Sequence, residues 1–188
     1  MKKLAIFGSG EGSNAENICN YFLGSTNVKV VFICTNNKHA FIVNRAKKLN
    51  LPIIYTTKND LANFYDLHKT LKDYAVDYIV LAGFLLKIPL KMVASYPKKI
   101  INIHPSLLPK YGGKGMYGVN VHRAVLKNND VESGITLHFV NQNYDEGEVI
   151  LQKKCVVSAN ETIESLKIKI GALEFKYFAS TIEKILLQ

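Results

Sequence analysis

This sequence has few cysteines, no long apolar run and no leader-like segment, and each shortage excludes a class of protein. Its three cysteines, Cys19, Cys34 and Cys155, are widely spaced and form no C-x-x-C pair. That spacing argues against a zinc site or a disulfide framework and suits a reducing cytosol. The longest apolar runs, such as residues 78–82, are far too short to cross a membrane. The N-terminus lacks the apolar region and cleavage site of a signal peptide, so we expect a cytoplasmic protein with neither a metal site nor a membrane partner.

The positive charges of the chain have no pattern typical of nucleic-acid binding. The net charge of +9 at pH 7 favours anionic ligands, either nucleic acid or small phosphorylated or polycarboxylate molecules. The lysines are scattered and form only short pairs such as Lys47-Lys48 and Lys98-Lys99. No recognition-helix, RNP or zinc-finger pattern accompanies them. We therefore interpret most of the charge as a solvated surface and expect small-molecule substrates but no nucleic-acid partner.

Apolar runs that predict buried strands alternate along the chain with stretches of helical periodicity. At 188 residues, 48% of them hydrophobic, the chain is long enough for one substantial core, and we expect a single domain over residues 1–188. The expected strands are 4–7, 28–34, 53–55, 78–82, 100–103, 133–140 and 149–157. The expected helices are 15–23, 40–49, 60–74 with Asp60 as its cap, 89–96, 120–127, and a last one that ends near 187. This alternation predicts an α/β fold with a doubly wound, mostly parallel sheet and one antiparallel strand.

A glycine-rich turn, residues 8–14, joins the first expected strand to the first expected helix. This layout is typical of a phosphate site, because free N–H groups and the positive end of the helix dipole meet there. A dinucleotide fingerprint would need glycine where Ser13 stands, and a P-loop would need Gly-Lys-Ser/Thr. Ser13 or Asn14 could cap the helix and still face an anion. A tight turn without any ligand explains the same residues equally well.

Residues 100–112 combine a buried strand with two polar side chains. Asn102 and His104 are two residues apart and point to the same side of a strand, which Pro105 then ends. An amide and an imidazole thus lie together at the carboxyl end of a strand, the edge where open α/β sheets bind ligands. The amide can donate to a carbonyl oxygen that gains negative charge, and the imidazole can supply a proton. By itself, however, Asn-x-His is more often structural.

The sequence Asn-x-His-Pro-Ser-Leu-Leu-Pro-Lys-Tyr resembles the signature of the folate-dependent formyltransferases, and the similarity extends over nearly the whole chain. The resemblance implies a Rossmann-like fold and transfer of a formyl group from 10-formyltetrahydrofolate to the amine of glycinamide ribonucleotide. It assigns catalysis to Asn102, His104 and Asp145; by itself, Asp145 would be a turn former. A carboxylate beside the imidazole would raise the pKa of His104 and keep a proton available near neutral pH.

The resemblance also implies two sets of substrate-binding residues. Positions 10–14 match the family's loop for the ribose phosphate, and Glu174, on the apolar side of the last helix, would bind the glycinamide end or simply pair with a lysine. The ribonucleotide set is Gly12, Ser13, Asn14 and Glu174. The folate set is Leu85, Leu86, Lys87, Ile88, Asn102, Asn141, Gln142, Asn143, Tyr144 and Asp145. Lys58 is the nearest candidate for the arginine that the family often offers to the folate tail.

Several alternatives stay open at this point. The glycine-rich loop 110–119 is longer than the common family version and is either a mobile lid or an ordinary insertion. Formyltetrahydrofolate deformylases use the same catalytic residues but carry an N-terminal regulatory domain, and methionyl-tRNA formyltransferases carry a C-terminal RNA-binding domain. We expect neither domain here. A non-catalytic phosphate-binding or nucleotide-binding module would explain residues 8–14 but leave Asn102, His104 and Asp145 without a role.

Overall fold

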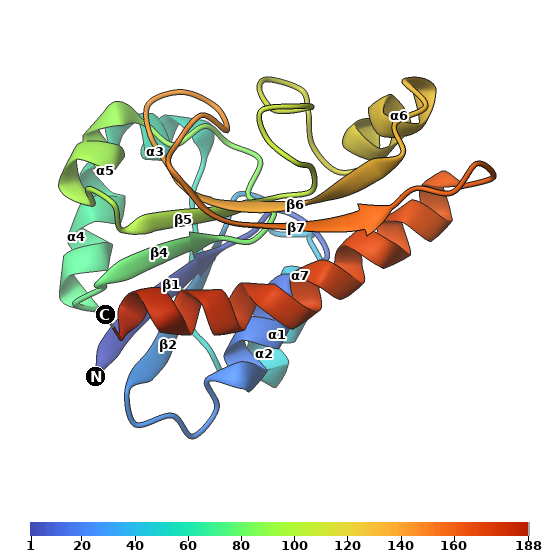
Figure 1. Cartoon of the computed structure of the whole chain (residues 1–188). Helices are drawn as coiled ribbons and strands as arrows, with labels where there is room; N and C mark the ends of the chain where they lie inside the picture. The colour runs from blue at the N-terminus through green and yellow to red at the C-terminus, as the bar shows by residue number, and fades with distance from the viewer. Residues whose placement is uncertain (188) are drawn as a thin grey trace.

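The expected strands join into one seven-stranded sheet in the computed structural model, which describes residues 1–187 (Figure 1). The strands are β1 (Lys2–Phe7), β2 (Val28–Thr35), β3 (Ile53–Tyr55), β4 (Tyr78–Leu81), β5 (Ile100–His104), β6 (Glu132–Phe139) and β7 (Val149–Val156). They lie in the order β3-β2-β1-β4-β5-β6-β7. Strands β1 to β5 pair in parallel, whereas β6 pairs antiparallel with both β5 and β7. The predicted doubly wound, mostly parallel α/β fold with one antiparallel strand is confirmed.

Helices cover both faces of this sheet. They are α1 (Ser13–Tyr21), α2 (Ile42–Lys48), α3 (Lys58–Asn63), α4 (Tyr65–Asp73), α5 (Leu90–Ser95), α6 (Val119–Lys127) and α7 (Ile163–Leu186). Helices α1, α2 and α7 contribute to one hydrophobic cluster and α3, α4 and α5 to a second. The long helix α7 runs across one face of the sheet and packs against α1 (Figure 1). Within the described chain, no helix is both long and apolar enough to cross a membrane.

The central strand β1 explains why the sequence gives two layers of helices. The side chains of Leu4 and Ile6 belong to the cluster on the α7 face, and those of Ala5 and Phe7 belong to the cluster on the α4 face. All four side chains are fully buried. A continuous apolar run of this kind can be accommodated only where a strand is covered on both faces.

Strand β1 lies at the point where the order of the strands in the sheet reverses, because it pairs with β2 on one side and with β4 on the other. The chain adds β2 and β3 on one side of β1, and then β4 and β5 on the other. Ligands of open α/β folds bind beyond the carboxyl ends of the strands at such a point. Ser9, just after β1, joins the two turns there: its N–H donates to the Gly83 carbonyl at 3.0 Å, and its hydroxyl accepts from the Leu85 N–H at 2.9 Å. The glycine-rich turn 8–14 and the apolar turn 83–88 therefore form one edge.

The expected helix from Asp60 to Tyr74 is in fact two helices, and its expected cap is wrong. Thr57 caps α3, because its hydroxyl accepts from the Asp60 N–H at 3.2 Å while the Asp60 carboxylate accepts from the Thr57 N–H at 2.8 Å. Phe64 then adopts a φ of 63°, which separates α3 from α4. Its ring is buried in the cluster on the α4 face, and burial of an aromatic ring offsets the cost of this backbone conformation.

The expected cap of α1 is also wrong, since neither Ser13 nor Asn14 caps this helix. Gly12 holds the N-cap position with a φ of 75°, and the helix has no side-chain cap. A Cβ atom at Gly12 would lie 2.6 Å from Cγ1 of Ile42. Helix α2 thus packs directly on this turn, and glycine is needed there for structure, whichever ligand the turn holds.

We predict that Phe178→Ala on α7 lowers the free energy of unfolding by about 3–5 kcal/mol, because it opens a cavity in the core. Phe178 is fully buried, whereas Phe175 on the same helix is 68% exposed. The matched control Phe175→Ala should change the stability by less than about 0.5 kcal/mol. Urea unfolding followed by circular dichroism measures both; similar losses for the two variants would contradict the placement of α7.

Candidate active site

Three side chains from two separate parts of the chain meet at the carboxyl end of β5. Asn102 and His104 lie on β5, and Asp145 lies in the loop between β6 and β7. His104 Nδ1 is 3.5 Å from Asp145 Oδ2, and the Asn102 side-chain amide donates to Asp145 Oδ1 at 3.4 Å. The structure thus brings the three predicted catalytic residues together around one carboxylate.

A fourth side chain, His138, completes this cluster and was not predicted. It lies opposite Asn102 in the β5–β6 pairing, and its Nε2 is 3.0 Å from the Asn102 side-chain nitrogen and 3.6 Å from Asp145 Oδ1. Its Nδ1 is 2.9 Å from the Phe139 carbonyl oxygen, so Nδ1 carries the proton and Nε2 accepts from Asn102. The alternating pattern of residues 133–140 already placed His138 on the polar face of its strand. Only the strand register could show that this face meets Asn102.

The protonation of His104 follows from its two neighbours. Its Nε2 lies 2.7 Å from the Tyr111 carbonyl oxygen, which can only accept, so Nε2 carries a proton and Nδ1 faces Asp145. Burial lowers the pKa of His104, and the charge of His138 lowers it further. The Asp145 carboxylate and the Tyr111 carbonyl raise it, but the net pKa lies below the usual value. The expectation of a raised pKa is therefore wrong, because desolvation of the buried ring outweighs the attraction of the carboxylate.

The environment of Asp145 keeps it ionised. Burial by itself would raise the pKa of this carboxyl, but the His138 and His104 rings, which stabilise the anion when they are protonated, and the Gly113 N–H together hold it below its usual range. The Gly113 N–H donates to Oδ2 at 2.9 Å, which ties the loop after β5 to the loop after β6. Gly147 lets the second loop close, because a Cβ atom there would lie 1.6 Å from the Phe139 carbonyl oxygen.

The residues predicted to hold folate line two adjoining pockets. The first, about 70 Å³, includes Leu86, Lys87, Ile88, Asn102, Asn141, Asn143, Tyr144 and Asp145, together with Phe84 from the turn after β4 and the unpredicted His138 and Val140. The second, about 670 Å³, adds Leu85, Gln142 and the weaker candidate Lys58. The Lys87 ammonium lies 5.3 Å from the centre of the Tyr144 ring, and so links the turn after β4 to the loop after β6. All ten predicted residues therefore lie around one continuous hollow.

Two of the residues predicted to hold the ribonucleotide meet directly, although they are far apart in the sequence. The Asn14 side-chain amide donates to Glu174 Oε2 at 2.8 Å, which joins the start of α1 to α7. Burial raises the pKa of the Glu174 carboxyl, and the hydrogen bond from Asn14 lowers it less. The first backbone bond of α1 runs from the Glu16 N–H to the Gly12 carbonyl, so the N–H groups of residues 13–15 have no partner within the helix. Among residues 1–187, no hydrogen bond or ion pair links this pair to Asn102, His104 or Asp145.

A buried hydroxyl on β6 holds the loop that follows His104. The Thr136 hydroxyl donates to the Ser106 carbonyl at 2.7 Å and accepts from the Leu108 N–H at 3.0 Å. The Gln152 amide on β7 donates to the Leu108 carbonyl at 2.8 Å. Neither residue was predicted, because a hydroxyl or an amide on a strand gives no sign in the sequence of which loop it will hold.

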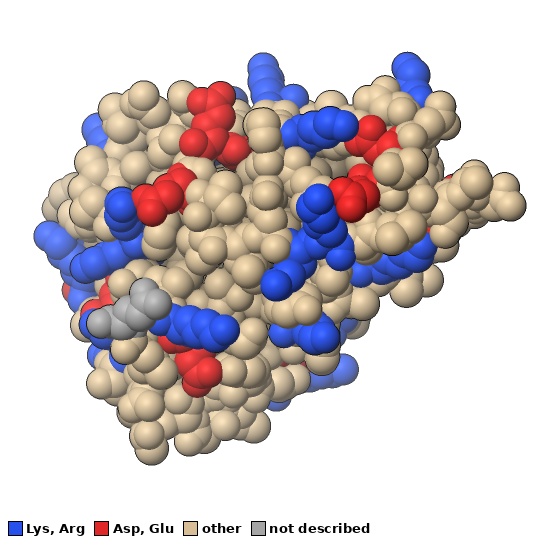
Figure 2. Space-filling model, in the orientation of Figure 1, with Lys and Arg blue, Asp and Glu red and all other residues tan. Residues whose placement is uncertain are grey.

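The face of the molecule seen in Figure 2 carries no concentrated patch of one charge. Figure 2 shows lysine and arginine side chains scattered over the visible face with acidic residues between them. In the part of the chain that the structure describes, no group of three or more histidine, cysteine, aspartate or glutamate side chains could hold a metal ion.

Comparison with known proteins places this geometry in one family. The sequence model described as "Formyl transferase" matches residues 2–182. Over 98% of its length, the chain is 40% identical to the chloroplastic phosphoribosylglycinamide formyltransferase of Arabidopsis thaliana, of which it spans 65%. It is 32% identical to phosphoribosylglycinamide formyltransferase of Haemophilus influenzae, with 97% of this chain and 86% of that protein covered. The crystal structure of glycinamide ribonucleotide transformylase 1 from Geobacillus kaustophilus matches with a TM-score of 0.90 at 29% identity, over 99% of both chains.

We predict that the imidazole of His104 titrates below the usual pKa of histidine and that Asp145→Asn lowers its pKa further, because the variant removes the nearby anion. NMR titration of the ring carbon signals measures both. Asp66→Asn on the exposed surface of α4 is the control and should leave the titration of His104 unchanged. A His104 pKa that rises in Asp145→Asn would contradict the placement of the carboxylate.

Proposed function

Because this chain belongs to the formyl transferase family, we propose that it transfers a formyl group from 10-formyltetrahydrofolate to the amine of glycinamide ribonucleotide. The observation that carries the proposal is the convergence of Asn102, His104 and Asp145 at a hollow lined by every residue predicted to hold folate. The names of the relatives support the choice of ribonucleotide as acceptor. A bare phosphate-binding module would not require this cluster.

The amine of the ribonucleotide attacks the formyl carbon directly, so the reaction needs no enzyme nucleophile. Cys19 and Cys34 are buried, and burial raises the pKa of both thiols to about 12, which makes them poor nucleophiles. As the tetrahedral intermediate forms, its oxygen becomes negative and needs a donor. The Asn102 amide is that donor: its contact with Asp145, 3.4 Å, is longer than a good hydrogen bond, so this N–H can turn to the oxyanion.

His104 moves the proton that the amine must lose. With its pKa lowered, the ring is neutral at rest, and Nδ1 can take the proton while the nearby Asp145 carboxylate stabilises the imidazolium. The Tyr111 carbonyl keeps the ring in one orientation through Nε2. The same proton then passes, through water, to the folate nitrogen as its bond to the formyl carbon breaks. His104 and Asp145 return to their starting states.

The two substrates approach the cluster from different elements. We assign the ribonucleotide phosphate to residues 12–14, where the N–H groups of Ser13 and Asn14 have no partner within the helix, and the glycinamide end to Glu174, which the Asn14 bond holds in place. Folate takes the hollow after β4 and β6, where Lys58 and Lys87 lie exposed towards its carboxylates. We further propose that residues 1–188 act as a single cytoplasmic domain on these small molecules, without metal, nucleic-acid or membrane partners.

A single assay separates this activity from deformylation. Release of tetrahydrofolate from 10-formyltetrahydrofolate is followed with and without glycinamide ribonucleotide. We expect release only when the ribonucleotide is present, in equal amount to the formylated product. Equal release without it would identify a deformylase, and no release under either condition would leave only a binding module.

We predict that Asp145→Asn lowers kcat by at least about a hundredfold, as expected for a group that supports acid–base transfer, and changes both KM values little. Asn102→Ala and His104→Ala should each lose rate, and the double variant should lose less than the product of the single losses, because both act on one intermediate. Steady-state kinetics with Asp66→Asn as control measures this. Strictly multiplicative losses would mean that Asn102 and His104 act at separate sites.

We predict that Glu174→Gln raises KM for the ribonucleotide by about tenfold or more, because a hydrogen bond to a charged group contributes about 1.5–3 kcal/mol, and leaves KM for the folate unchanged. Glu164→Gln, an exposed acid on the same helix, is the matched control. A substitution at Gly12 would not test this assignment, because the added side chain would collide with Ile42. An equal rise in both KM values would count against the assignment.

A further inference from the structure

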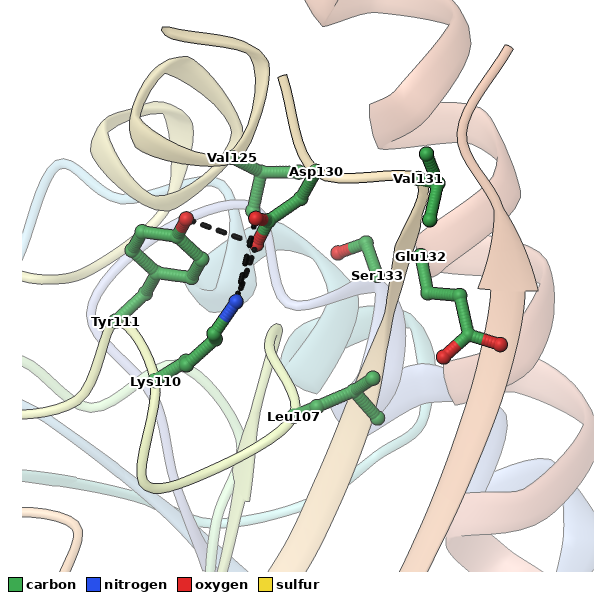
Figure 3. A pocket seen from close by; sticks show the side chains of 8 residues that line it. All are labelled: Leu107, Lys110, Tyr111, Val125, Asp130, Val131, Glu132 and Ser133. Carbon is green, nitrogen blue, oxygen red and sulfur yellow. Dashed lines mark hydrogen bonds and ion pairs between the residues drawn. The ribbon is translucent and has the colours of Figure 1, made fainter. Parts of the chain in front are cut away.

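A second, separate pocket of about 260 Å³ lies between the loop after β5, the end of α6 and the start of β6 (Figure 3). Its apolar walls come from Leu107, Val125 and Val131, and its polar groups come from Lys110, Tyr111, Asp130, Glu132 and Ser133. It shares no lining residue with the folate hollow. The proposed reaction therefore gives this pocket no role.

Asp130 is the main charged group inside the pocket. Its carboxylate accepts from the Lys110 ammonium at 3.2 and 3.3 Å and from the Tyr111 hydroxyl at 2.9 Å, as Figure 3 shows. The Asp130 side chain is only 18% exposed, whereas that of Lys110 is 68% exposed. An exposed lysine is weakly held in such a pair, so another cation can take its place beside the carboxylate.

The hydroxyl of Ser133 is the second polar group, and it has no partner among the described residues. Ser133 is only 2% exposed and its hydroxyl oxygen is buried, and Figure 3 shows this oxygen turned towards the side formed by Asp130 and Tyr111. A buried hydroxyl without a hydrogen bond is costly and calls for an explanation. A ligand that donates a hydrogen bond to this oxygen would explain why the hydroxyl has no partner within the protein.

We propose that this pocket binds a small primary ammonium compound with a short apolar body. Of the two lining carboxylates, Glu132 is paired with Lys154, whose ammonium lies 2.9 Å away, so Asp130 is the carboxylate available to a ligand. An ammonium donates to Asp130 and to the Ser133 hydroxyl, while the apolar body packs on the three apolar walls. The volume is below the usual range of pockets for drug-sized ligands, roughly 300–1,000 Å³, and this sets the size limit.

Occupancy of this pocket reaches the catalytic cluster through Tyr111. The hydroxyl of this residue donates to Asp130 at 2.9 Å, and its carbonyl accepts from His104 Nε2 at 2.7 Å. A ligand at Asp130 thus acts on the residue that orients His104. Binding itself can be measured without any formyl donor, so its outcome does not depend on the proposed function.

The test compares three probes of the same shape that differ in charge: 3-methylbutylamine, 3-methylbutan-1-ol and 3-methylbutanoate. Titration near pH 7 is followed by NMR shifts of the full chain. We expect saturable shifts at Ser133 and Tyr111 with the amine, at least about tenfold weaker binding of the alcohol, because charged hydrogen bonds are the stronger ones, and no binding of the acid. No saturable shift with the amine, or equal affinity for amine and alcohol, would overturn the proposal.

Matched variants locate the site. Ser133→Ala and Asp130→Asn should each weaken binding of the amine by about tenfold or more, whereas the exposed controls Ser95→Ala and Asp66→Asn should not. If Ser133→Ala raises thermal stability but leaves the affinity for the amine unchanged, the hydroxyl is only an unsatisfied core group and the proposal fails. The three-probe comparison on the unmodified chain stands even if a variant does not fold.

Discussion

The ionised carboxylate of Asp145 is the constraint on which the cluster at the carboxyl end of β5 depends. It contacts groups from three segments: Asn102 and His104 on β5, His138 on β6, and the Gly113 N–H in the loop between them. A negative charge taken partly out of water must be compensated by donors and cations. The Asn102 amide and the Gly113 N–H supply part of that compensation, and the two imidazoles add to it when they are protonated. The carboxylate thus fixes how the loops after β5 and β6 close on one another.

The cluster gains its precision from backbone carbonyls rather than from further side chains. The Tyr111 carbonyl sets the proton on His104, and the Phe139 carbonyl sets the proton on His138. These two assignments direct both free ring nitrogens towards the Asn102–Asp145 side. Burial holds the pKa of His104 down while Asp145 opposes it, so a change in charge during a reaction would move that balance directly. A ring that is neutral at rest can accept a proton during a reaction and release it again.

The interior on either side of β1 supports this site without taking part in it. Two apolar clusters cover the sheet, and the turns after β1 and β4 are tied by Ser9. Gly12 in the first of these turns packs against Ile42, whose N–H donates to the Gly10 carbonyl at 3.1 Å. The start of α1 is therefore packed against α2, and the Asn14–Glu174 hydrogen bond joins it to α7.

The sequence alone determined the α/β alternation, the burial of strands such as Leu4–Phe7 on both faces, and the two-residue spacing that turns Asn102 and His104 to one side. These are local properties: apolar runs, periodicity and the geometry of a strand. Resemblance added Asp145 and Glu174, whose roles no local pattern could reveal. Only the tertiary structure decided the partners. The strand register brought His138 to Asn102, the packing of Ile42 removed the expected cap of α1, and the burial of Phe64 divided one helix into two. Burial also reversed the expected direction of the His104 pKa, because desolvation depends on every segment packed around a group and not on the residues beside it in the sequence.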